Sequence, residues 1–96
     1  MTTHTITVYD PTAPAIIAGA NLAPRLHRLR GTRAGILDNV KPNAGILMAA
    51  IVDSLKDEYG IASVTVRNKP VAGPASPAVV ADLARECDFV LVGSAD

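Results

Sequence analysis

The sequence predicts a small three-layer α/β unit with a parallel sheet in β-α-β-α-β order, preceded by an extended N-terminal arm. Three observations support this prediction: short apolar runs that end in polar residues, two amphipathic helical patterns between them, and Pro or Gly at the boundaries. Strands that alternate with helices imply right-handed crossovers, as in Rossmann-like sheets. We expect residues 1–33 to form an arm in contact with a partner, and residues 34–96 to form a parallel α/β half-domain.

The arm is irregular in sequence and long for a connection within a compact domain. Thr5–Tyr9 alternates in polarity and could form a short strand. Three leucines at near-helical spacing suggest one amphipathic turn: Leu22, Leu26 and Leu29. The arginines between and after them are assigned to an interface or to solvent rather than to substrate: Arg25, Arg28 and Arg30.

The first strand and helix are expected next. Ala34–Asp38 is a short apolar run with a polar end, typical of a buried parallel strand. Pro42 suits the first turn of a helix, which Asn39 or Asn43 could cap. Gly60 is placed where the helix end requires left-handed geometry. The apolar face of this helix is expected from residues spaced by three and four: Leu47, Met48, Ile51, Val52, Leu55 and Tyr59.

The second half repeats the pattern. Ala62–Arg67 is rich in β-branched residues and predicts a strand. Ser76 and Pro77 suit the cap and first turn of a second helix, and Asp88–Gly93 predicts a third strand. The apolar face of the second helix is expected from Val79, Val80, Leu83 and Ala84.

The third predicted strand needs packing partners on both of its faces. Its run Phe89–Val92 is typical of a strand buried on both faces. Three strands and two helices do not easily cover such a strand. Either a second chain or a copy of this one completes the sheet, or this is an edge strand covered by the arm.

Composition excludes several classes of function. Nine basic and nine acidic residues give zero formal charge, which argues against a nucleic-acid or membrane-surface binder. Cys87 is the only cysteine, so an internal disulfide is impossible and no metal site is expected on this chain alone. We assign Cys87 to packing, because Glu86 and Asp88 beside it disfavour a thiolate. With no apparent signal peptide or spanning segment, a cytoplasmic location is expected.

Candidate binding residues collect at the carboxyl ends of the strands, where parallel sheets bind ligands. They are assigned to a small anionic substrate, since a helix N-terminus and a lysine both favour a carboxylate or phosphate: Asp38, Asn39, Lys41, Asn43, Gly93 and Ser94. The alternative is that Asn43 only caps the helix and Asp38 only orders the turn.

Several segments resemble one family. Leu37-Asp-Asn-x-Lys-Pro-Asn-Ala44 is the most specific, and it is joined by Tyr9-Asp-Pro-Thr12, Leu22-Ala-Pro-Arg25, and Glu86–Phe89 leading to Gly93. Together they resemble the N-terminal half of the UGSC-type (seleno)protein family. In that family a cysteine or selenocysteine after the last strand opens a Cys/Sec-Gly-Ser-Cys motif. This motif is distantly similar to that of the B component of glycine, sarcosine and betaine reductases.

The resemblance implies that the reactive group follows Asp96 on a partner chain, with Ala95 and Asp96 at the junction, through either a split gene or a cleaved precursor. It implies a subunit of a heteromeric enzyme, with thiol chemistry or a metal held by partner-chain cysteines. Reductive cleavage, hydration and elimination stay open. The alternatives are a non-catalytic, anion-binding homodimeric module and a fragment with a structural role only.

Overall fold

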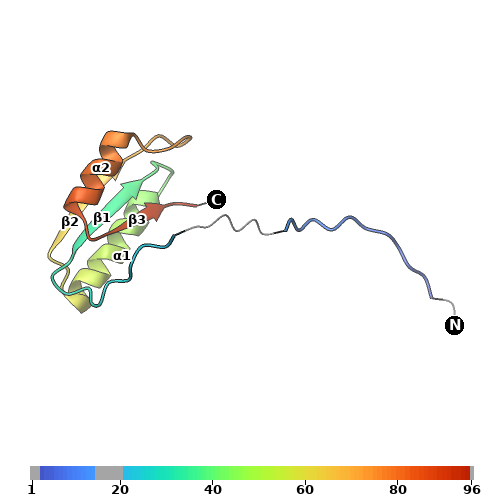
Figure 1. Cartoon of the computed structure of the whole chain (residues 1–96), viewed down its shortest axis with the longest axis horizontal. Coiled ribbons are helices and arrows are strands. Elements are labelled where there is room, and N and C mark those ends of the chain that lie inside the picture. The colour runs from blue at the N-terminus through green and yellow to red at the C-terminus, as the bar shows by residue number, and fades with distance from the viewer. Residues whose placement is uncertain (1–2, 15–20, 96) are drawn as a thin grey trace.

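The computed structural model describes residues 3–14 and 21–95, in which three parallel strands form a sheet in the order β2-β1-β3. The two helices lie on opposite sides of the sheet (Figure 1), so the predicted three-layer α/β class is confirmed. Each element begins or ends within two or three residues of its prediction. The elements are β1 (Arg33–Asp38), α1 (Ala44–Tyr59), β2 (Ser63–Asn68), α2 (Pro77–Glu86) and β3 (Phe89–Gly93).

The main core lies between α1 and the sheet. Ile36 at the centre of β1 packs with a row of α1 residues spaced by four, Ala44, Met48 and Val52, all of them buried. The predicted apolar face of α1 is therefore only partly right. Leu47, Ile51 and Tyr59 on the neighbouring row are exposed, although Leu55 of that row packs against the core. The contacts of α1 with the sheet are mainly with β1 and β3.

The opposite face carries α2. Ser76 caps this helix as predicted, and its Oγ accepts from the N–H of Val79 at 3.3 Å. Leu83 is buried against the sheet. A Cβ on Gly35 would lie 2.7 Å from the Sγ of Cys87, so the missing side chain of Gly35 lets the end of α2 approach β1. Cys87 is half-buried in this packing.

The starting ends of β1 and β3 are joined by one ion pair. The Arg33 guanidinium donates to both carboxylate oxygens of Asp88, at 3.2 and 3.3 Å, and the Arg33 backbone N–H donates to the same carboxylate at 2.7 Å. These bonds lower the pKa of Asp88 below its ordinary value of 3.8. The pair therefore fixes where β3 starts beside the central strand.

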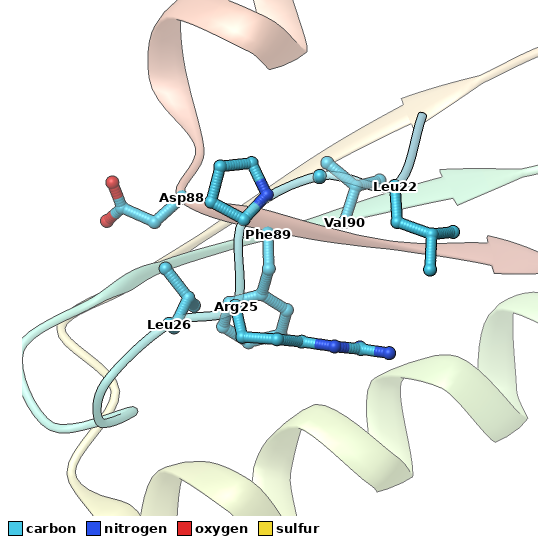
Figure 2. A pocket seen from close by; sticks show the side chains of 8 residues that line it. Leu22, Arg25, Leu26, Asp88, Phe89 and Val90 are labelled. Carbon is cyan, nitrogen blue, oxygen red and sulfur yellow. The ribbon is translucent and has the colours of Figure 1, made fainter. Parts of the chain in front are cut away.

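The arm does not form the expected regular elements. Thr5–Tyr9 is not a strand, and residues 3–14 are exposed along their whole length. The amphipathic turn expected around Leu22 and Leu26 is also absent, and both side chains are exposed. The leucine spacing does not produce a helix because Pro24 interrupts it and disfavours helical geometry in the residue before it. Instead, residues 22–26 pass beside the first residues of β3 (Figure 2).

Candidate anion-binding site at the strand ends

Five of the six predicted binding residues, all but Asn43, meet in one contact network where β1 and β3 end and α1 begins. Adjacent parallel strands bring Asp38 beside Gly93 in register. The residues that follow, Asn39 and Ser94, then lie side by side, and the Lys41 side chain reaches the same segment. The polarity of parallel strands predicts this convergence from the sequence, but the individual contacts are visible only in the structure.

The side-chain amide of Asn39 is used twice on Ser94. Its Oδ1 accepts from the Ser94 N–H at 2.9 Å, and its Nδ2 donates to the Ser94 carbonyl at 2.8 Å. The Asn39 backbone N–H donates to the carbonyl of Gly93 at 3.0 Å. Asn39 is only 9% exposed, so its amide takes the place of the water that the N–H and the carbonyl of Ser94 would otherwise bind. Its geometry is that of a structural link between the strand ends rather than that of a helix cap.

Lys41 places a cation at the same point. Its Nζ donates to the Ser94 carbonyl at 3.3 Å, beside the Nδ2 of Asn39. The residue is half-buried, and the first turn of α1 contains no acidic residue. A partly desolvated ammonium next to a helix N-terminus favours an anionic ligand.

Asp38 orders the turn and also adds a negative charge. Its Oδ1 accepts from the N–H of Val40 at 2.8 Å. A Cβ on Gly45 would lie 2.5 Å from its Oδ2, so the carboxylate rests against the first turn of α1. Part of the favourable field of the helix N-terminus is therefore already used within the chain.

Two residues of the turn adopt left-handed backbone geometry. Asn43 has φ 66°, and its carbonyl accepts the first helical bond from Leu47 at 3.0 Å, but its side chain makes no capping hydrogen bond. The interpretation of the Asn43 side chain as a cap is therefore wrong. Val40 has φ 56°, which is unusual for a β-branched residue. Nothing in the sequence pattern signals this conformation, which concentrates backbone strain beside Lys41.

The charged side chains at the end of β2 make other contacts, although the Lys69 backbone N–H donates to the carbonyl of Asp38 at 2.9 Å. Arg67 pairs with Glu86 of α2 at 3.2 Å. The Nζ of Lys69 donates to the neighbouring carbonyl of Pro70 at 2.7 Å. The side chains of the candidate site thus come from the end of β1 and from the turn before α1, beside the end of β3.

The arginines predicted at an interface lie away from the strand ends. Arg25 lines an open pocket of about 400 Å³ at the starting end of β3, where its side chain runs past Phe89 toward α1 (Figure 2). Arg30 lies against Gly60, with its Nη1 3.4 Å from a Cβ placed there, and Arg28 is exposed. No sequence pattern predicts this pocket, because it depends on how residues 22–26 lie beside β3.

Two further predictions concern metals and the junction. Residues 3–14 and 21–95 contain no group of three His, Cys, Asp or Glu side chains arranged to hold a metal ion. Ala95 is exposed beyond Ser94, and Asp96 lies outside the described residues. No helix in the described part of the chain is long and apolar enough to cross a membrane.

Comparison with known proteins gives one match. The model of the UGSC family matches residues 7–96, which is nearly the whole chain and includes both the arm segments and the strand-end segment described above. No curated protein and no solved structure matches the chain. The chain therefore belongs to the UGSC family.

Proposed function

We propose that this chain is the anion-holding subunit of a heteromeric cytoplasmic enzyme whose reactive cysteine lies on a partner polypeptide. The observation that carries the proposal is the convergence of Asn39, Lys41 and Ser94 at the strand ends. The ligand is a small carboxylate- or phosphate-bearing metabolite. The partner bears a Cys-Gly-Ser-Cys-like motif, and its thiolate, or a metal held by its cysteines, performs an oxidoreductase, lyase or hydratase reaction.

The charges at the strand ends support the substrate class. The Lys41 ammonium attracts the anionic group, and the Asp38 carboxylate accepts from Val40 nearby. A metabolite that brings a hydrogen-bond donor beside its carboxylate or phosphate satisfies both charges. A ligand with several anionic groups is disfavoured, because Asp38 repels the second charge.

The open edge of β3 supports the partner. Within the described residues β3 pairs only with β1, so one row of its backbone N–H and C=O groups has no strand beside it. Val92 on this strand is 67% exposed, and Leu47 and Ile51 of α1 are exposed as well. A partner that adds a strand here would bury these side chains and place its own residues next to Ser94.

Co-purification with a motif-bearing partner tests the proposal. The tagged chain is co-expressed with the family polypeptide that carries the Cys-Gly-Ser-Cys-like motif, and the complex is isolated and assayed for bound metal. Val92→Asp should abolish co-purification, since it places a charge on the open edge. Val66→Asp is the matched control, because this valine is 53% exposed on the opposite edge strand, β2.

The variants also discriminate against the alternatives. If both valine variants co-purify as well as the unmodified chain, the β3 edge is not the interface. If the chain binds anions but forms only homodimers in the presence of the motif-bearing polypeptide, it is a binding module and the enzyme proposal is overturned.

A further inference from the structure

The Ser94 carbonyl receives two donors from the same turn, and they differ in kind. The amide of Asn39 is rigidly set by its buried position and reaches the carbonyl at 2.8 Å. The ammonium of Lys41 ends a flexible four-carbon side chain and reaches it at 3.3 Å. The carbonyl is thus a fixed acceptor for Asn39 and an anchoring point for Lys41.

From this geometry we infer that Asn39 is a positioning residue, which aims the Lys41 ammonium at the strand-end site by fixing the Ser94 peptide group. The inference rests on the proposed function only in treating that ammonium as the anion-binding group. Lys41 has three ammonium hydrogens, so it can hold the Ser94 carbonyl and an anion at once. Asn39 itself does not need to touch the ligand.

Two features make Asn39 suited to this role. Its two bonds to Ser94 run in opposite directions, from the Ser94 N–H and to the Ser94 carbonyl, which fixes the orientation of the residue as well as its distance. Its Oδ1 also accepts from the Lys41 backbone N–H at 3.4 Å. The Asn39 amide therefore holds both the backbone of Lys41 and the Ser94 carbonyl that the Lys41 ammonium contacts.

The rotamer entropy of Lys41 links the position of the Ser94 peptide to anion affinity. Ordering a lysine side chain costs rotamer entropy, and an anchoring point that is already in place reduces the part of this cost that falls on ligand binding. If the Ser94 peptide moves, Lys41 loses this anchoring point although its charge is unchanged. Removal of the Asn39 amide should therefore raise the Kd for an anion even though Lys41 itself is unchanged.

NMR on the full chain tests the inference without any ligand. In Asn39→Ala, Ser94 N–H exchange should become about tenfold faster, as expected for loss of a buried hydrogen bond. The order parameter of the Lys41 ammonium should fall toward that of Lys56, which is exposed on α1. Asn68→Ala is the matched control, because Asn68 ends the neighbouring strand and is exposed, and it should change neither quantity.

A second variant covers the case in which Asn39→Ala fails to fold. Asn39→Leu keeps the volume of the side chain but loses both hydrogen bonds to Ser94. It should loosen Lys41 and accelerate Ser94 exchange, as Asn39→Ala does. If Ser94 exchange accelerates in the folded variants but the Lys41 order parameter does not change, Asn39 has a structural role only and the inference is overturned.

A phosphate titration of the same samples separates this inference from the proposed function. A fall in affinity caused by Asn39→Ala should disappear when Lys41 is already alanine, since both changes act through one ammonium. Additive losses would overturn the inference. If the unmodified chain binds neither phosphate nor acetate, the anion site is wrong, while the Lys41 order parameter still decides the role of Asn39.

Discussion

The side-chain amide of Asn39 pairs with both backbone groups of Ser94, a residue 55 positions later in the chain. This pair extends the contact between β1 and β3 by one residue beyond the last strand pairing, Asp38 with Gly93. The chain after β3 therefore leaves the sheet in a direction set by a side chain of the β1–α1 turn. Lys41 reaches the same carbonyl, so the strand ends and the candidate anion site form one unit.

Replacing Lys41 with alanine should weaken anion binding. Its ammonium provides a charge-assisted interaction, so the apparent Kd for phosphate should rise about tenfold. Asn43→Ala should raise it only about twofold, because that amide is neutral and exposed. Two-dimensional NMR titrations of the folded chain measure both values.

Lys69→Ala is the control for the loss of a positive charge. This lysine follows the adjacent strand, and its ammonium bonds to the Pro70 carbonyl. Its removal should leave the phosphate Kd unchanged. Equal weakening by Lys41→Ala and Lys69→Ala would show that only general charge attracts the anion.

Val40→Gly should stabilise the fold. A valine at φ 56° carries about 1–2 kcal/mol of backbone strain that glycine does not. The greater freedom of glycine in the unfolded chain offsets about 0.5–1 kcal/mol of this gain. Val40 is 48% exposed, so little burial is lost. We expect the free energy of unfolding in urea to rise by about 0.5–1 kcal/mol.

Val71→Gly provides the comparison. Val71 is similarly exposed in the loop after β2 and is not among the residues with positive φ. It should therefore lose about 0.5–1 kcal/mol through unfolded-state entropy alone. A loss of stability in both variants would mean that Val40 is not strained.

Gly45→Ala should depend on Asp38. In the unmodified chain the new methyl displaces the Asp38 carboxylate and its bond to Val40, which offsets the helix propensity gained. With Asp38→Ala already present, the same change should stabilise the fold by about 1 kcal/mol. Urea unfolding of the two single variants and the double variant measures the coupling.

Independent sites give additive changes in unfolding free energy within about 0.5 kcal/mol. Additivity here would therefore contradict the close approach of the Asp38 carboxylate to the first turn of α1.

Acid should remove the stabilisation that comes from Asp88. Hydrogen bonds from Arg33 lower the pKa of Asp88 in the folded chain below its ordinary value of 3.8. The folded state then binds protons less readily than the unfolded state, so stability is complete above pH 3.8 and falls as the pH drops through the lowered pKa. Urea midpoints measured from pH 7 to pH 2 should show this decline.

Asp88→Asn should flatten the decline and lower stability at pH 7. Asp53→Asn, an exposed change on α1, should leave both the pH profile and the stability at pH 7 unaltered. If the Asp88 variant follows the same acid profile as the unmodified chain, another group causes the decline.

Local patterns in the sequence were enough to determine the element order, the Ser76 cap and the left-handed Gly60, which has φ 73°. Each depends on neighbours within one or two turns, which periodicity and capping rules describe. The location of Asp38, Asn39 and Lys41 at a strand end follows from the same rules. The polarity of parallel strands was then sufficient to predict a site there.

Tertiary structure decided what these residues do. The α1 row that is buried depends on which strands lie beneath the helix, and this selected Met48 and Val52 over Leu47 and Ile51. The Asn39–Ser94 pair depends on the order β2-β1-β3, which brings the end of β3 beside β1. A sequence pattern records spacing along the chain, whereas strand order is a balance of packing across the whole sheet. For that physical reason the contacts between distant residues, and with them the geometry of the site, were visible only in the fold.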